Sequence, residues 1–548
     1  MSVEWDYIIV GGGTAGCVLA NRLSASGRHR VLLLDAGIPD RSPYIHVPAG
    51  IAKAASDERL NWNYQAEPDV TRGGAVEFWP AGKALGGCSS INGMIHVRGN
   101  PRDFDDWAAS GAGGWDYQSV LPYFKRAECF EGGADDYRGD DGPHPVSHLR
   151  VDHPLTDGFI EAAQQAGHVL NLDYNGERQS GVSRMQVNQR RGWRHSTAKA
   201  YLKPARRRSN LDVITEAHVE RILTSAHRAV GVQYSQGGES HTVRCNVETI
   251  LCAGAIASPK ILMLSGIGPT DVLDRYEIPV IAATSRVGEN LQEHPVAPMA
   301  WHVSQPTLNT ELNLAGMIKH GLNWLFYRRG AIMMPAGHAQ IFFKTDAALD
   351  RPNIQAIFTP LCYGTSEGES QADWGLYDKA AVMVGVCLMN TRVRGRITLG
   401  AANPAVAPVI SHQLLSDADD IKALTAGCEE VRRVFKEAGL APYVTDEFMP
   451  GSSVTTDEHF EEYLMQNIAM GYHAVGTCAM GSDTDSVVDA CLRVNGVLGL
   501  RVVDASVMPT LTTGNTNAPV VMIAEKAADM ILSDSVKASE GASATAEW

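Results

Sequence analysis

The chain has 548 residues, of which 44% are hydrophobic and 20% are charged, and its formal net charge is −15 at pH 7. This length supports about two or three domains, and the composition is ordinary for a globular protein. The negative charge argues against binding to nucleic acid or to anionic membrane surfaces. The ten cysteines form no C-x-x-C pair, so the sequence indicates neither a metal site nor a disulfide framework.

The N-terminus and the lengths of the apolar runs indicate where in the cell the protein is expected. The N-terminus lacks the basic and apolar regions of a secretory signal. No run of about 18 apolar residues predicts a membrane span. Together with the scattered cysteines, this leads us to expect a cytoplasmic protein without a membrane span.

The N-terminal segment predicts a unit of strand, helix and strand. Residues 7–10 and 31–34 are short apolar runs typical of buried strands. Between them, Gly11, Gly13 and Gly16 form the pattern G-x-G-x-x-G at the turn into a helix. The first glycine permits a tight turn, the second lets backbone approach a pyrophosphate, and the third lets helix and strand pack closely.

An acid at the end of the second strand completes a dinucleotide-binding pattern. Asp35 closes that strand, 19 positions after Gly16. Its carboxylate can accept hydrogen bonds from a ribose diol and would repel a 2′-phosphate, which argues against NADP. The helix N-terminus supplies free N–H groups and a positive dipole for the phosphates. The pattern alone leaves NAD and FAD open.

A second glycine-rich stretch, G-K-A-L-G-G-C-S-S-I-N-G-M-I-H-V-R-G-N, occupies positions 82–100. Its small residues supply many backbone N–H groups, which can face an anionic or planar ligand. A helix that begins with a serine cap would explain the same composition. Trp62 lies in the excursion before this stretch, where it would either flank a flavin or simply pack.

The order of the predicted elements indicates an α/β fold in which one domain interrupts another. A buried strand stopping at Cys252 and a last strand at 500–503 would both return to the nucleotide sheet. Residues 296–470 have a different texture, with alternating strands, one of them at 381–388, and a clear helix at 419–438. We therefore expect a discontinuous Rossmann-like dinucleotide-binding domain at 1–154, 204–295 and 471–535, an inserted α+β substrate domain on a mainly antiparallel sheet at 155–203 and 296–470, and a C-terminal tail at 536–548.

Several blocks, in this order, resemble the glucose–methanol–choline (GMC) oxidoreductase family. Residues 254–268 fit the family's second signature at every constrained position. Residues 82–105 fit the first signature largely, with Cys88 and His96 at positions where other residues are usual. The block V-G-E-N-L-Q-E-H-P at 287–295 and the terminal M-P…N-T-N-A-P block are also similar to the family.

The resemblance implies FAD as the cofactor, oxidation of an alcohol, and a working pair of residues. His473 stands in the G-Y-H-A-V-G-T block at the place of the family's catalytic histidine, with Ala474 replacing the usual proline. The second member of the pair, a His or Asn in the family, is Asn517 here, 44 positions further on. Ile91 stands where some members carry a histidine bonded to the flavin, so we predict non-covalent FAD.

The chemistry expected of this pair is proton removal followed by hydride transfer. A neutral imidazole with a pKa of about 6.5 can take the hydroxyl proton, so His473 is the candidate base. Asn517 would donate a hydrogen bond to the developing alkoxide while hydride moves to flavin N5. The residues expected to bind FAD are Gly11, Gly13, Thr14, Ala15, Gly16, Asp35, Ala36, Trp62, Gly87, Asn92, Gly93, Met94, Ile95, Val219, Ala253, Tyr472, Asp504, Ala505 and Thr516.

The substrate pocket carries no motif of its own. We expect Phe358, Tyr363, Trp374 and Tyr472 to line it, which suits an aromatic, furanic or aliphatic primary alcohol. Either O2 or a quinone-type acceptor would reoxidise the flavin, and the protein would act as a monomer or homodimer. The alternatives are a hydroxynitrile lyase without net redox chemistry, a choline-type dehydrogenase, an NAD-dependent dehydrogenase and a non-catalytic FAD-binding protein.

Overall fold

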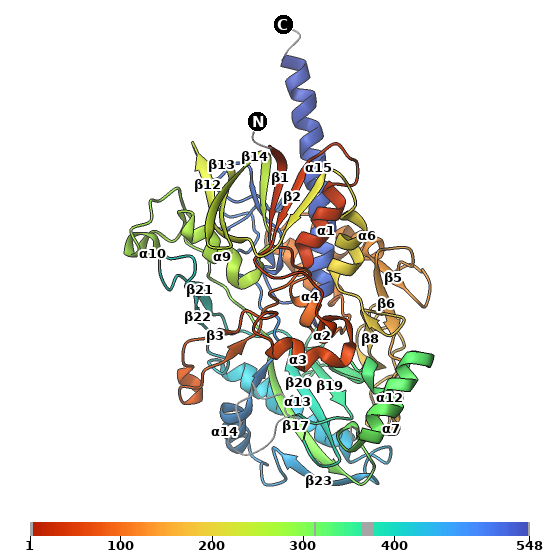
Figure 1. The fold of residues 1–548 in the computed structure, drawn as a ribbon. Helices are drawn as coiled ribbons and strands as arrows, with labels where there is room; N and C mark the ends of the chain where they lie inside the picture. Colours follow the sequence, from red (N-terminus) through yellow and green to blue (C-terminus); the bar gives the residue numbers. More distant parts are fainter. Residues whose placement is uncertain (1–3, 312–313, 364–376, 546–548) are drawn as a thin grey trace.

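The computed structural model describes residues 4–311, 314–363 and 377–545. Two large β-sheets organise it, the first toward the top of Figure 1 and the second toward the bottom. Each sheet collects strands from distant parts of the chain. The helices and long loops between them position the residues discussed below.

The first sheet has seven strands in the order β11-β2-β1-β14-β13-β12, with β25 paired to β14. Its central pairs, β11 with β2, β2 with β1, β1 with β14 and β14 with β25, are parallel. The strands are β1 (Trp5–Val10), β2 (Val31–Leu34), β11 (Leu211–Ile214), β12 (His218–Ser225), β13 (Arg228–Gln236), β14 (Glu239–Leu251) and β25 (Leu500–Val502).

Burial on both faces explains the continuous apolar runs of β1 and β2. Every residue of β2 is buried, as is typical of a central parallel strand. Two helices, α1 (Thr14–Leu23) and α15 (Asn517–Thr545), pack beside one another next to these strands (Figure 1). The large apolar core around this sheet includes residues of β1, α1, β2 and α15.

The second sheet also has seven strands, in the order β23-β17-β20-β19-β18-β7, with β24 paired to β17. All of its pairings are antiparallel. The strands are β7 (Gly181–Arg184), β17 (Pro295–Val303), β18 (Ala339–Phe343), β19 (Ile354–Thr359), β20 (Ala381–Leu388), β23 (Val444–Met449) and β24 (Ala469–Met470).

Helices cover one face of this second sheet. The helices α7 (Pro154–Gln165) and α13 (Ala418–Phe435) bury their apolar sides in one core with alternate residues of the strands. In β20 these are Val382, Val384 and Val386, whereas Met383 and Cys387 point to the opposite face. The period of two therefore gives the sheet a covered face and a face that is open to a cavity.

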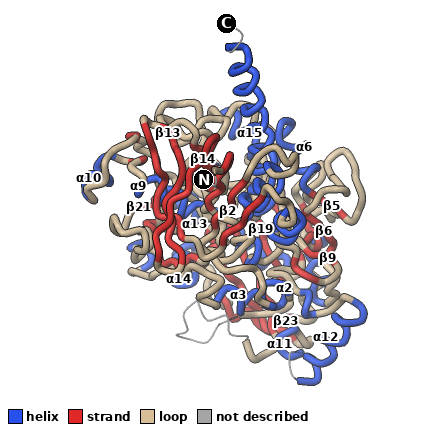
Figure 2. Tube along the Cα trace, turned by 45° about the horizontal axis from the view of Figure 1, so that its top comes forward, coloured by secondary structure: helices blue, strands red, loops and turns tan. Residues whose placement is uncertain are grey.

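Shorter elements connect the two sheets. Those used below are α3 (Ile51–Ser56), β4 (Phe78–Trp79), α4 (Cys88–Ile91), β9 (Gln189–Arg190), β10 (Trp193–Arg194), α9 (Gly254–Leu264), α11 (Leu308–Glu311), α12 (Leu314–Tyr327) and the 3₁₀ helix η4 (Ala331–Met333). Figure 2 shows α11 and α12 at the outer edge of the molecule, away from the first sheet.

The predicted α/β fold class is confirmed, because the first sheet, with parallel central strands, and the second, antiparallel sheet are formed by the regions that the sequence indicates. The strands predicted at 31–34 and 381–388 coincide with β2 and β20, and the helix predicted at 419–438 is α13. The segment predicted as a C-terminal tail at 536–548 is helical up to Thr545, as the end of α15. Among the described residues, no helix has the length and apolar character needed to cross a bilayer.

Candidate active site

A cavity of about 970 Å³ is lined by residues of both sheets. On the side of the first sheet, the cavity is lined by the turn between β1 and α1, the turn around α4, and the start of α9. On the side of the second sheet, it is lined by η4 and by the residues of β17, β19 and β20 that point away from the covering helices. The segments at 470–474 and 515–520 complete the lining. We call the first group the nucleotide wall and the second group, with 470–474, the substrate wall.

Glycines bring backbone close together in the nucleotide wall. A Cβ on Gly11, whose φ is +104°, would lie 2.4 Å from the carbonyl oxygen of Cys252. One on Gly16 would lie 1.9 Å from the carbonyl oxygen of Gly11, which fixes the close packing of helix on strand. Gly87, with φ +52°, would place a Cβ 2.8 Å from Cα of Gly13. The two glycine-rich turns thus meet at a place where no side chain fits.

Asp35 is held by backbone at the end of β2. Its two carboxylate oxygens accept hydrogen bonds from the N–H groups of Gly12 and Gly37, at 2.7 and 2.8 Å. Burial raises the pKa of Asp35, and these two donors act against that rise. Carboxylate oxygens have further lone pairs, so Asp35 can still accept from a ribose hydroxyl.

The turn at 92–95 is braced from within and from behind. The Oδ1 atom of Asn92 accepts from the N–H of Met94 at 3.0 Å and from Nη1 of Arg194 at 2.8 Å. Met94 has a φ of +61°, and its carbonyl accepts from the N–H of Asn188 at 2.9 Å. The cavity-lining backbone of this turn therefore has a defined shape before any ligand binds.

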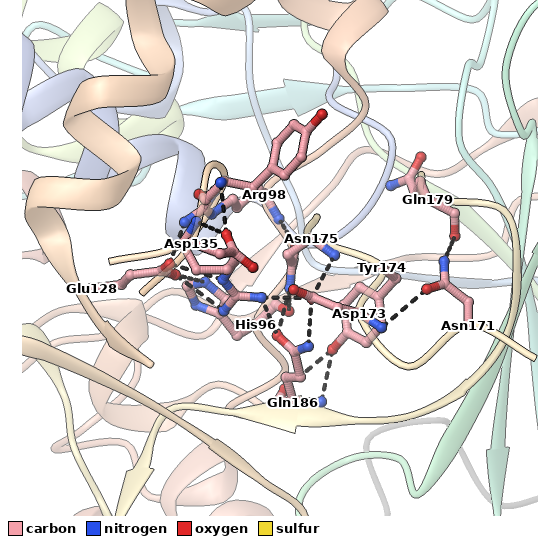
Figure 3. Close-up of polar contacts among 12 residues, drawn as sticks. His96, Arg98, Glu128, Asp135, Asn171, Asp173, Tyr174, Asn175, Gln179 and Gln186 are labelled. Carbon is pink, nitrogen blue, oxygen red and sulfur yellow. Dashed lines mark hydrogen bonds and ion pairs between the residues drawn. The ribbon is translucent and has the colours of Figure 1, made fainter. Parts of the chain in front are cut away.

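A buried ionic network lies behind this turn (Figure 3). Arg98 and Arg138 both donate to the carboxylate of Glu128, and Nη1 of Arg138 lies 2.6 Å from Oδ1 of Asp173. Burial raises the pKa of Glu128, but Arg98 and its other partners outweigh it and hold that pKa below its ordinary value. Because Asp173 comes from a distant segment, the network ties the segment at 96–98 to the 171–186 region.

His473 sits in the cavity within a chain of hydrogen bonds. Its Nδ1 lies 3.0 Å from Nδ1 of His294, whose Nε2 lies 3.1 Å from the carbonyl oxygen of Met389. A carbonyl can only accept, so His294 carries its proton on Nε2 and accepts at Nδ1. His473 must then donate from Nδ1, which leaves its Nε2 unprotonated.

Burial keeps both imidazoles neutral. It lowers the pKa of His473 to about 4 and that of His294 well below the ordinary value, the latter with a contribution from His473. The carboxylate of Glu293 accepts from the backbone N–H groups of His473 and His294, at 2.7 and 2.8 Å. These bonds fix the backbone beside the ring, and burial raises the pKa of Glu293 to about 8. The site thus presents a neutral, oriented imidazole.

The amide that is hydrogen-bonded to the His473 ring is that of Asn515, and the predicted partner Asn517 also lines the cavity. Nδ2 of Asn515 lies 3.0 Å from Nε2 of His473. Asn517 is the first residue of α15, and its Oδ1 accepts from the hydroxyl of Thr14 at 3.1 Å. The N-T-N block offered both asparagines, and the spacing of 44 selected the one that belongs to the helix. The neighbouring His294 was missed as a partner of His473, although it lies in the V-G-E-N-L-Q-E-H-P block.

Most of the other predicted site residues line the cavity. Gly16 does not, because this residue of α1 packs against Gly11 and Ile9 at the end of β1. The predicted residues that do are Gly11, Gly13, Thr14, Ala15, Asp35, Ala36, Trp62, Gly87, Asn92, Gly93, Met94, Ile95, Val219, Ala253, Tyr363, Tyr472, His473, Asp504, Ala505, Thr516 and Asn517.

Phe358 is a correction among the predicted substrate residues. It is fully buried on the covered face of the second sheet and stacks on Phe159 of α7, with ring centroids 4.5 Å apart. Its neighbours Ile357 and Thr359 face the cavity instead, as the alternation along β19 requires. Trp374 lies outside the described residues.

The sequence of the whole chain is similar to those of one known protein family. Models of the family described as GMC oxidoreductase match residues 5–296 and 391–524. The chain is 39% identical over 533 residues to oxygen-dependent choline dehydrogenase of Brucella anthropi, covering 97% of this chain and 96% of that protein.

Solved structures give the same result for the fold. Pyridoxine 4-oxidase of Mesorbium loti has a TM-score of 0.86 and 29% identity, over 96% of this chain and 99% of that chain. Formate oxidase of Aspergillus oryzae, in a variant studied for FAD modification, has a TM-score of 0.89 and 25% identity, over 97% of this chain and 98% of that chain.

The residues of the nucleotide wall fit the FAD that this family uses. The N-cap residue of α1 is Gly13, which has no side chain to cap the helix, so the first N–H groups of α1 remain available to phosphates. Because Gly87 lies close to Gly13, protein backbone would contact a bound pyrophosphate from two sides. Asp35 would accept hydrogen bonds from the ribose, and the turn at 92–95 would offer backbone groups to a flat ring.

Proposed function

Because the chain belongs to the glucose–methanol–choline oxidoreductase family, we propose that it oxidises an uncharged primary alcohol to the aldehyde with non-covalently bound FAD. The observation that carries this proposal is the hydrogen bond between Nδ1 of His473 and Nδ1 of His294, which assigns the proton of His473 to Nδ1 and leaves Nε2 free to accept, in a residue that lines the cavity shared by the nucleotide and substrate walls. When bound, FAD supplies the acceptor for the hydride.

His473 is the proposed base. Its Nε2 accepts the hydroxyl proton of the alcohol, and its Nδ1–H remains bonded to His294. An alkoxide is a far better hydride donor than an alcohol, so removal of this proton and departure of hydride from carbon belong together. His294 is a positioning residue in this scheme, because its bond to the carbonyl of Met389 sets the tautomer of His473.

Asn515 is the proposed partner of the base. Its Nδ2 group lies 3.0 Å from the same nitrogen that receives the proton, so both side chains converge on one point. An amide N–H at that point can donate to the substrate oxygen as negative charge develops. This assignment takes the place of the one expected for Asn517.

The substrate wall supports an apolar alcohol. The side chains that face the cavity from β17, β19 and β20 are Val296, Ile357, Thr359, Met383 and Cys387. Tyr363 and Tyr472 also line it, and their ring faces suit aromatic or furanic groups as well as alkyl chains.

A choline-type substrate is the second candidate, favoured by the name of the relatives that are 39% identical. Within the described part of the chain, the acids that line the cavity are Asp35, Glu293 and Asp504. Each accepts hydrogen bonds from backbone N–H groups, as Asp504 does from Gly254 at 2.9 Å. A quaternary ammonium would have to compete with those donors, which is why we place an uncharged alcohol first.

The test is an anaerobic titration of the yellow protein with a panel of primary alcohols that includes choline. Bleaching near 450 nm by aromatic or aliphatic alcohols at lower concentrations than choline supports the proposal, and the reverse order supports the second candidate. A flavin that no alcohol reduces, in a protein that cleaves a cyanohydrin, would indicate a lyase. Readmission of air then separates an oxidase, which recovers at once, from a dehydrogenase that needs a quinone-type acceptor.

Two further properties belong to the proposal. Ile91 lines the cavity with a side chain that cannot bond to flavin, so acid precipitation should release the yellow colour into the supernatant. All ten cysteines are free thiols, which supports a location in the reducing cytoplasm.

A further inference from the structure

The helix α12 presents an apolar stripe to solvent. Ile318, Leu322, Leu325 and Phe326 recur at the spacing that places residues on one helix face, and 57%, 51%, 53% and 69% of their surfaces are exposed. Tyr327, at 74%, extends this stripe. Such a stripe ordinarily faces the core of a protein. Figures 1 and 2 instead show α12 at the outer edge of the molecule, beside the second sheet.

Contacts on the inner side fix the rotation of α12. The indole Nε1 of Trp324 donates to the carbonyl oxygen of Gly192 at 2.8 Å. Its ring packs edge-on against Trp193, with centroids 4.5 Å apart, and His320 on the same side is buried. The β9–β10 hairpin therefore anchors the polar and aromatic side of the helix, and the apolar stripe points outward.

Basic residues flank the exposed stripe, in contrast to the acidic character of the whole chain, and Glu311 lies on the inner side of α12, 3.3 Å from Nε2 of His320. Lys319 and Arg329 are exposed on α12 and just after it, and Arg190 and Arg191 are exposed in the anchoring hairpin. Neither 312–345 nor 178–211 contains an aspartate or glutamate, although the chain carries a net charge of −15. We refer to α12 and the hairpin at 189–194 as the α12 surface.

We propose that the α12 surface docks on an anionic phospholipid bilayer, with α12 lying in the plane of the interface. An exposed apolar stripe flanked by Lys, Arg and aromatic residues is the pattern of helices that bind membrane surfaces without crossing them. The basic residues select the anionic headgroup, reversing locally the repulsion expected from the net charge. A second copy of this chain is the less favourable occupant, because its Lys319, Arg329, Arg190 and Arg191 would meet the same four cations.

Docking would bring the cavity wall to the membrane. Residues 328–330 link α12 to η4, and Ala331, Ile332 and Met334 line the cavity. An apolar alcohol that partitions into lipid would then reach the cavity from the bilayer. This consequence rests on the proposed function, whereas the docking itself does not.

The experiment is flotation of the holoprotein with vesicles of phosphatidylglycerol and phosphatidylcholine, or of phosphatidylcholine alone. We expect flotation with the anionic vesicles that weakens as salt is added. The variant L325S/F326S should partition about tenfold less or worse, because it removes two exposed apolar side chains from the stripe. The variant K319E/R329E should lose its preference for the anionic vesicles.

A matched control separates the stripe from general surface apolarity. Leu498 is 66% exposed next to β25 of the first sheet, so Leu498→Ser should partition like the unmodified protein, whereas Leu325→Ser should not. None of these residues lines the cavity, so flavin content and reduction by a water-soluble alcohol should stay unchanged.

Two results would overturn the proposal. One is absence of flotation with anionic vesicles, or equal flotation of L325S/F326S and the unmodified protein. The other is a dimer in sedimentation velocity that L325S/F326S converts to monomer, which would make the face a contact between copies. Flotation needs no turnover, so a protein inactive on every alcohol would still report on docking.

Discussion

The nucleotide wall and the substrate wall form one cavity by opposite means. In the nucleotide wall, glycines let backbone approach backbone, and a single added carbon on Gly16 would lie 1.9 Å from an oxygen. In the substrate wall, side chains such as Met383 and Ile357 project from a regular sheet, and other apolar side chains would fit the same backbone. The close backbone contacts of the nucleotide wall allow only glycine at the positions concerned. The substrate wall requires only that an apolar residue be on the cavity-facing side of its strand.

The largest expected effect comes from removing the proposed base, His473, which should impair catalysis without affecting the nucleotide wall. In His473→Ala we expect flavin reduction to slow by roughly 10²–10⁴-fold, the scale of a lost general base. The nucleotide wall is untouched, so the FAD content should remain that of the unmodified protein. Stopped-flow absorbance at 450 nm measures the first quantity, and the ratio of absorbance at 450 and 280 nm measures the second.

The control is His218→Ala, which removes a second cavity-lining imidazole at the start of β12 and should leave the reduction rate largely unchanged. The pH profile adds an independent check. Because burial lowers the pKa of His473 to about 4, the base stays neutral above that pH, and the rate should show no fall centred near pH 6.5. A change centred near pH 8 would instead report on Glu293, whose pKa burial raises to about 8. A fall centred near pH 6.5 would mean that the base is an exposed histidine.

The two asparagines of the N-T-N block give the next largest effect. Asn515→Ala removes the amide beside Nε2 of His473, so we expect reduction to slow by about 10²-fold, the lower range for loss of one such donor. Asn517→Ala breaks only the bond to the Thr14 hydroxyl, so its main effect should be weaker FAD binding. A larger rate loss in Asn517→Ala than in Asn515→Ala would restore the pairing expected from the sequence.

These asparagines also mark the limit of what the sequence predicts. The glycine turns and Asp35 were predictable because their backbone geometry admits few alternatives. Which of Asn515 and Asn517 is hydrogen-bonded to the ring of His473 was not, since it depends on the residue at which α15 begins. Likewise, a strand pattern predicts that Ile357 and Phe358 face opposite sides of β19, but not which side is the cavity. That follows only from the packing of α7 against Phe358.

The substitution Gly16→Ala should disturb the nucleotide wall and leave the substrate wall unchanged. The new methyl group would push the carbonyl of Gly11 out of the turn, and such overpacking costs about 1–3 kcal/mol. We expect FAD binding to weaken roughly 10- to 100-fold, measured by fluorescence titration of the apoprotein. Gly113→Ala is the matched control, because its added carbon would meet nothing within 4 Å. Unchanged FAD affinity in Gly16→Ala would contradict the account of this wall.

The smallest expected effect tests the substrate wall through two adjacent residues of β20. Met383 faces the cavity, so Met383→Ala should shift the preference among alcohols of different size by about tenfold in kcat/KM, the scale of a changed apolar pocket. Val384 is fully buried on the covered face, so Val384→Ala should instead lower the stability by about 1–3 kcal/mol and leave the preference unchanged. Thermal unfolding and a series of alcohols of increasing chain length measure both quantities in both variants. If Val384→Ala changed the preference and Met383→Ala did not, the two faces of the sheet would be reversed, and the cavity would belong to the side that α7 and α13 cover.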